Sequence, residues 1–260
     1  SDAIKCLFNK IDSFTKEKIN YKILTERCIF SREVHLNSVL EIVFKVKHAE
    51  NNKLLLLSKV YSIDHKNVSA YFETSISLDL NKEIKKIILD LFSSNCSTFL
   101  NELEFLNLRP LSENRPPKYY SRNAFISCKK AVNTWDLDHQ SMGSSQFKIN
   151  CVSDAATHLF TYCGADFIWR NNYDIGSAAL DYSVRYFKEA QLGMAVTIYT
   201  NFTKISNKTL KFIHHMVEDS TGDVIMDIEI VAVLFDLKKR KSVVVPEEFR
   251  LKASKLLIDN

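Results

Sequence analysis

Glycine is scarce in this chain of 260 residues, and its glycines do not cluster. All five lie in the second half of the chain: Gly143, Gly164, Gly176, Gly193 and Gly222. A dinucleotide-binding fingerprint and a phosphate-binding P-loop both need closely spaced glycines, because the backbone must approach phosphate there. The sequence therefore excludes nucleotide-binding enzymes of these two kinds.

The chain also lacks a strong charge imbalance, a long apolar run and paired cysteines. Lys and Arg number 35 against 31 Asp and Glu, and a net charge of +4 is too small an excess to predict a nucleic-acid partner. Apolar runs such as 54–57 are far below the roughly 20 residues that span a bilayer. The six cysteines form no CxxC pair, so we expect reduced, mostly buried thiols. Because no secretory segment opens the sequence, we expect a cytoplasmic protein with no membrane span.

Apolar residues make up 46% of the chain and aromatic residues 11%, which is enough for a sizeable core. Alternation of apolar and polar residues predicts strands over 29–36, 38–48 and 53–79, the last long enough for a hairpin, with turns at 51–52 and 65–67. The pattern recurs over 178–237, with turns at 206–208 and 220–222. A helical stretch near 86–106 and a polar segment at 109–122 lie between these two regions.

The two halves resemble each other at nearly constant offsets. The run 1–3 with Phe8 recurs as 153–155 with Phe160, and the run 78–80 recurs as 235–237. Glu33 and Leu36 likewise recur as Glu189 and Leu192. We therefore predict a duplicated helix-plus-sheet unit over 1–106 and 123–260, joined by a linker at 107–122.

The second half has the clearer helix. An apolar face over 150–163 predicts it, with Asn150 or Ser153 as its cap and Gly164 at its end. A strand over 124–135 precedes this helix. The first half shows no such strand, so it lacks the strand, borrows one, or has it in residues that precede Ser1.

A strand, an Asp-Leu-Asp turn, one helix and a run of long antiparallel strands together resemble the hot-dog fold. The stretch 135–142 resembles the turn of the 4-hydroxybenzoyl-CoA and betainyl-CoA thioesterase family, well over 124–250 and weakly over 1–85. The resemblance places Asp138 at the catalytic carboxylate, Met142 at an aliphatic position and Phe147 near an aromatic one, while Ser141 replaces the usual glycine. It implies an α+β double hot-dog protein, with a continuous antiparallel sheet wrapped on two central helices.

Hydrolysis of a thioester needs a carboxylate that attacks the carbonyl carbon or activates water, and donors for the developing oxyanion. We therefore expect an acyl-CoA or acyl-carrier-protein thioesterase with Asp138 as nucleophile or general base. His139 is either a helper base or a solvated side chain. The other substrate-binding candidates are the acidic and threonine positions of the helix and the basic run that could meet a CoA 3′-phosphate: Asp154, Thr157, Lys239 and Arg240. Asp154 alternatively serves as a charge at the helix N-terminus.

Two other functions stay open at this point. The first half has no equivalent of Asp138, which favours a non-catalytic acyl-CoA or acyl-carrier binding or assembly protein. A hot-dog dehydratase or hydratase is the other alternative, although the chain lacks the Asp-x-Asn-Pro-x-x-His run of that class. Asp136 and Asp138 are also plausible as ordinary turn or capping carboxylates. The adjacent His214 and His215 favour a core or surface role, so we expect no metal and no other cofactor. We expect a monomer that is a pseudo-dimer, or a homodimer.

Overall fold

The computed structural model describes residues 4, 7–9, 12, 19–50, 52–78, 84, 86–88, 90, 120–138 and 141–258. The chain divides into two compact units, Ser1–Ser112 (unit 1) and Glu113–Asn260 (unit 2). Most of the predicted linker, and His139, lie outside the described residues.

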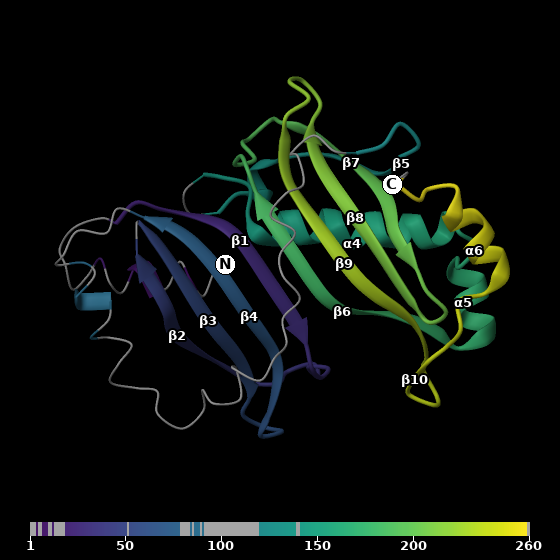
Figure 1. Ribbon diagram of the computed structural model, residues 1–260, viewed down its shortest axis with the longest axis horizontal. Helices are drawn as coiled ribbons and strands as arrows, with labels where there is room; N and C mark the ends of the chain where they lie inside the picture. Colours follow the sequence, from purple (N-terminus) through teal and green to yellow (C-terminus); the bar gives the residue numbers. More distant parts are fainter. Residues whose placement is uncertain are drawn as a thin grey trace. The chain divides into compact units, whose positions relative to one another are not determined.

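Unit 1 contains a sheet of four antiparallel strands, β1 (Tyr21–Phe30), β2 (Leu40–Glu50), β3 (Lys53–Ser62) and β4 (Asn67–Leu78), in the order β2-β3-β4-β1 (Figure 1). Ile4 and Phe8 are helical and belong to its core, where the Phe8 ring stacks on Tyr21 at 4.1 Å. The hairpin predicted over 53–79 is confirmed as β3 and β4.

The strand predicted at 29–36 is wrong, because β1 covers Tyr21–Phe30 and a loop follows it. Glu26 and Arg27 are both buried in β1, so two charges occupy interior positions and the strand does not read as an alternating one.

Unit 2 begins with β5 (Phe125–Ala131), a 3-10 turn η1 (Thr134–Asp136) and the long helix α4 (Ser145–Tyr162). A short helix α5 (Phe167–Tyr173) leads to β6 (Ile175–Tyr186), β7 (Ala195–Ile205), β8 (Thr209–Glu218) and β9 (Val224–Asp236), and the chain then forms β10 (Lys241–Ser242) and α6 (Glu247–Ser254). The long strands follow the antiparallel order β6-β9-β8-β7-β5, with α4 lying across one face (Figure 1). The turns predicted at 206–208 and 220–222 are confirmed.

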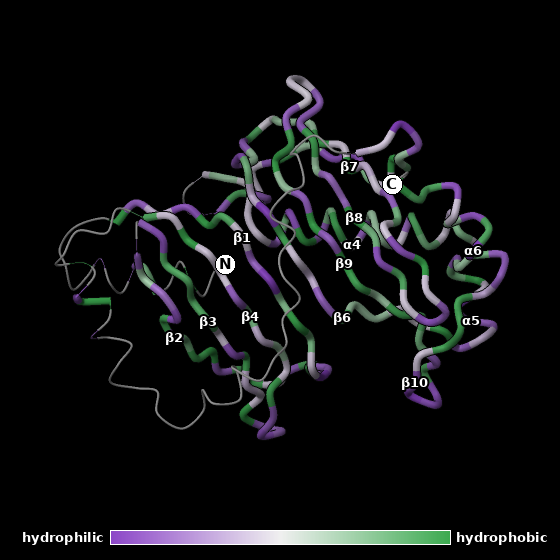
Figure 2. Tube along the Cα trace, in the orientation of Figure 1, coloured by the Kyte–Doolittle hydropathy of each residue, from purple (hydrophilic) through white to green (hydrophobic). Residues whose placement is uncertain are grey.

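Side chains along each strand point alternately to the two faces of the sheet, and the apolar face packs against α4. Leu210, Phe212 and Met216 of β8 join the core beneath the helix, and polar and apolar residues alternate along the strands (Figure 2). On the helix, Cys151, Ala155 and Leu159 recur every four residues and are wholly buried.

The predicted start and cap of this helix are wrong. α4 begins at Ser145, and the side chain of Ser144 accepts a hydrogen bond from the Phe147 amide at 3.0 Å, so neither Asn150 nor Ser153 is the cap. Phe147 is buried one turn before Cys151 and extends the apolar stripe backwards. Gly164 follows the end of the helix as predicted, with φ +99°. The helices α5 and α6 were not predicted.

The four long strands follow one another in the same spatial order in each unit, β1-β4-β3-β2 in unit 1 and β6-β9-β8-β7 in unit 2. The predicted reduced, buried thiols are confirmed for Cys128, Cys151 and Cys163, and Cys28 is buried as well. None of the helices in the described part of the chain has the length and apolar character needed to cross a bilayer.

Candidate active site

The Asp138 carboxylate lies in a tight turn between η1 and α4. The Asp138 amide donates to the Met142 carbonyl at 2.7 Å, and the Met142 amide donates back to Asp138 Oδ1 at 3.1 Å. Ser141 closes the turn by donating its amide to the Asp138 carbonyl at 3.0 Å. These bonds orient a half-buried carboxylate at the protein surface.

Ser141 occupies the left-handed region with φ +60°. This is the conformation that glycine adopts without steric cost, and the residue is the one that replaces glycine in the resemblance. The serine has therefore kept the glycine-type turn and carries backbone strain there.

The turn is anchored to the segment between β6 and β7. The Gly143 amide donates to the Ala190 carbonyl at 2.8 Å, and Met142 forms a bridge with Gln191. A Cβ at Gly143 would lie 2.8 Å from the Ala190 Cβ. Gly143 is therefore required for this close approach, and it fixes the position of the Asp138 turn.

The N-terminus of α4 follows the turn directly. Ser144 caps the helix, and its own amide donates to the Asp136 carbonyl at 2.8 Å. Asp136 Oδ2 in turn accepts from the Asn133 amide at 2.9 Å, which makes Asp136 a capping carboxylate. The helix end contributes positive potential close to Asp138, as stabilisation of an oxyanion requires.

A second carboxylate lies beside the anchored segment, and the sequence reasoning did not single it out. Glu189 precedes Ala190 and pairs with Lys148 of α4, with 2.9 Å between Oε2 and Nζ. The Lys148 side chain is 9% exposed and lies 5.5 Å from the centre of the Tyr186 ring. A buried lysine on the first turns of the helix is the signal that could have pointed to this pair, because such a charge needs a partner.

The remaining predicted residues on α4 have other contacts. Phe147 is 3% exposed and belongs to the core. Asp154 lies three turns into the helix and pairs with Lys130 of β5 at 2.6 Å, so its alternative role as an N-terminal helix charge is wrong. The Thr157 hydroxyl donates to the Ser153 carbonyl at 2.9 Å.

Lys239 and Arg240 lie in the turn between β9 and β10, beside the start of β6. Their neighbour Lys238 pairs with Asp174 at 2.5 Å, whereas the Asp138 turn is anchored beyond the other end of β6. A strand of 12 residues is about 35–40 Å long. Unit 2 therefore does not bring these basic side chains to the Asp138 turn, and their predicted role stays a prediction.

His214, Glu218 and Cys128 are among the groups in unit 2 whose pKa values are shifted. Burial and the adjacent His215 lower the pKa of His214 to about 3, and its Nδ1 lies 2.6 Å from the Thr200 hydroxyl. Hydrogen bonds from Lys188 and Ser220 lower the pKa of Glu218 to about 2. A hydrogen bond from Cys151 lowers the pKa of Cys128 to about 7.

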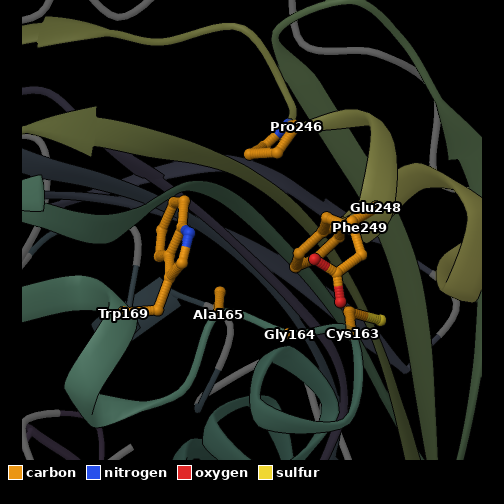
Figure 3. A pocket seen from close by; sticks show the side chains of 7 residues that line it. All are labelled: Cys163, Gly164, Ala165, Trp169, Pro246, Glu248 and Phe249. Atoms are coloured by element: carbon orange, nitrogen blue, oxygen red, sulfur yellow. The ribbon is translucent and has the colours of Figure 1, made fainter.

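A small apolar pocket opens at the opposite end of α4. Trp169 of α5 lines one side, Pro246 and Phe249 line the other, and Cys163 and Ala165 lie at the helix end (Figure 3). Because α4 has 18 residues and is about 27 Å long, this pocket is separate from the Asp138 turn.

Comparison with known proteins agrees with this geometry. Residues 132–252 match the thioesterase-like superfamily. Among solved structures, the chain is similar to a putative oleoyl thioesterase from Lactobacillus plantarum, with 14% identity over 90% of this chain and 82% of that one and a TM-score of 0.61. It is also similar to an acyl-ACP thioesterase from Bacteroides thetaiotaomicron, with 10% identity over 89% of this chain and 86% of that one and a TM-score of 0.56. No curated protein matches the chain in sequence.

These matches confirm the predicted fold class, an α+β double hot-dog. The match to the thioesterase-like superfamily covers residues 132–252, the part that contains Asp138, α4 and the long strands of unit 2. The recognition of hot-dog thioesterases in the sequence is thereby confirmed.

Proposed function

We propose that the protein hydrolyses acyl thioesters and that Asp138 is the catalytic carboxylate. The observation that carries the proposal is the turn itself, which holds a half-buried carboxylate in a fixed orientation directly before the N-terminus of a long helix. The superfamily match over the same residues supports the reaction class.

The reaction needs one carboxylate and a source of positive potential that stabilises the developing oxyanion. As a nucleophile, Asp138 attacks the thioester carbonyl carbon, the carbon–sulfur bond breaks, and the thiolate leaves and takes up a proton; water then hydrolyses the acyl-aspartyl anhydride. As a general base, Asp138 takes a proton from the water that attacks the same carbon. In both cases the amides at the start of α4 stabilise negative charge on the carbonyl oxygen.

The substrate class is a thioester of CoA or of an acyl carrier protein. One similar structure is a putative oleoyl thioesterase and another is an acyl-ACP thioesterase, and both cover most of this chain. Met142, within the turn, is the predicted contact for the acyl group, and His139 is the predicted helper base.

Release of free thiol tests the proposal, with acyl-CoAs of graded chain length and an acyl carrier protein thioester as substrates. We expect Asp138→Asn to lower kcat about 100-fold or more, because loss of a nucleophile or base costs at least this much. Asp136→Asn is the matched control, since an amide oxygen can still accept from the Asn133 amide, and it should keep most of the activity. Equal turnover by wild type and Asp138→Asn, or no turnover of any thioester, would contradict the proposal.

Binding without turnover is the second candidate, and one observation favours it. Asp138 Oδ1 already accepts the Met142 amide, as a structural turn carboxylate would. Acyl-CoA binding that persists without thiol release, equally in Asp138→Asn, would support this role.

A further inference from the structure

The edge of the sheet in unit 1 differs from the corresponding edge in unit 2. β2 and β7 hold the same place in the strand order of their units. β5 pairs with the outer edge of β7, from Phe125 opposite Thr200 to Ala131 opposite Ala195. In the part of unit 1 that the structure describes, no strand pairs with the outer edge of β2.

The outer edge of β2 presents both apolar side chains and peptide groups. Leu40 is 43% exposed and Ile42 is 41% exposed, whereas Phe44 and Val46, further along the same face, pack against the unit 1 core. The Ile63 amide donates to the Val39 carbonyl at 3.0 Å, so the peptide groups of Val39, and of alternate residues after it, face β3. Those of Leu40 and Ile42 consequently face the open edge.

We propose that this edge pairs with β2 of a second copy of the chain, forming a two-fold symmetric dimer with antiparallel strands. An exposed edge strand is a template for pairing with another strand, and a two-fold interface uses the same patch on both copies. The occupant is a second copy because the strand is complementary to itself.

The complementarity fixes the register. With the two-fold axis at Val43, Glu41 lies opposite Lys45 of the partner, and the pair occurs twice. On the other face, Ile42 lies opposite Phe44 and Leu40 lies opposite Val46, so the exposed apolar row becomes covered. Moving the axis by one residue in either direction places Lys45 opposite Val39 or Val43, and the charge pair is lost.

Peptide geometry is compatible with this register. The outward peptide groups belong to even-numbered residues at this end of β2, and an axis at Val43 pairs even-numbered residues with each other, as does an axis at either neighbouring residue, so the charge pair alone distinguishes these registers. Val43 and its copy then form a close pair without mutual hydrogen bonds, with about 4.5 Å between their Cα atoms.

Sedimentation equilibrium of the full chain across the micromolar range tests the dimer. We expect a dimer for the wild type and a dissociation constant at least about tenfold higher for Glu41→Lys, because two attractive pairs become repulsive. The double variant Glu41→Lys with Lys45→Glu should restore the wild-type constant. Lys129→Glu, a charge reversal on the exposed edge strand of unit 2, is the matched control and should leave the constant unchanged.

Cross-linking tests the register directly. Val43→Cys should give a disulfide-linked dimer under mild oxidation, since Cα atoms at this separation suit a disulfide, and the wild-type chain should not. A monomer at all concentrations, a dimer insensitive to Glu41→Lys, or β2 amides protected from hydrogen exchange in a monomer would each overturn the proposal.

Discussion

Units 1 and 2 order their long strands alike but differ, over the described residues, at the outer edge of the sheet. In unit 2, β5 covers the edge of β7, and a structured turn with Asp138 leads into α4. In the described part of unit 1, the corresponding edge of β2 has no such strand. The four-stranded antiparallel framework is therefore common to both units, and the candidate chemistry depends on a segment of unit 2, 125–147.

The largest effect on stability should come from a substitution in the core between α4 and the sheet of unit 2. Phe160 of α4 is 2% exposed, with its ring centre 5.7 Å from Phe212 and 5.6 Å from Phe249. We expect Phe160→Ala to lower the free energy of unfolding by about 3–5 kcal/mol, because it leaves a large cavity. Denaturant unfolding measures this, and a loss below about 1 kcal/mol would show that α4 is not held as described.

Gly143 tests whether the turn depends on close approach to Ala190. Gly143→Ala should cost about 1–3 kcal/mol and lower thioester hydrolysis, because the new methyl group would overlap Ala190 Cβ. Adding Ala190→Gly should recover part of both losses. If the single variant keeps wild-type stability and activity, the close approach is not required.

The free energy of unfolding should depend on pH through the buried His214 of unit 2. The pKa of His214 is about 3 in the folded protein and about 6.5 when unfolded, so the unfolded state binds more protons between these values. Stability should therefore fall as the pH drops below about 6.5, by about 2 kcal/mol at pH 5, and this histidine should contribute nothing above that range.

One variant isolates that contribution. His214→Asn should flatten the pH dependence of the free energy of unfolding. An unchanged slope in His214→Asn, measured by unfolding at pH 5 and pH 7, would contradict the assignment.

The smallest effect should come from the strained residue in the turn. Ser141 has φ +60°, so Ser141→Gly removes the steric cost of the left-handed conformation but adds entropy to the unfolded chain. We expect a net stabilisation of under about 1 kcal/mol, with activity retained. Thermal unfolding measures it, and destabilisation would mean that the Ser141 side chain contributes contacts of its own.

Much of this fold could be predicted from the sequence, because the long strands of unit 2 and the β3–β4 hairpin alternate clearly. The start of α4 could not, since Ser144 and Phe147 lie in a stretch whose first turn is mostly polar. The strand β1 was misplaced because it buries Glu26 and Arg27, and burial of charges depends on tertiary contacts.

The candidate site was only partly predictable. The short motif around Asp138 identified the turn, but its anchoring to Ala190 joins segments about 50 residues apart and is a tertiary feature. The pairing of Lys148 with Glu189 is likewise tertiary. The separation of Lys239 from Asp138 follows from strand length and direction, which residue types alone do not reveal.

The central claim is that Asp138 performs thioester hydrolysis in unit 2, and thiol release by Asp138→Asn tests it most directly. The account predicts that the variant stays folded and loses about 100-fold or more in kcat, while Asp136→Asn retains most of the activity. Undiminished hydrolysis by a folded Asp138→Asn protein would contradict it.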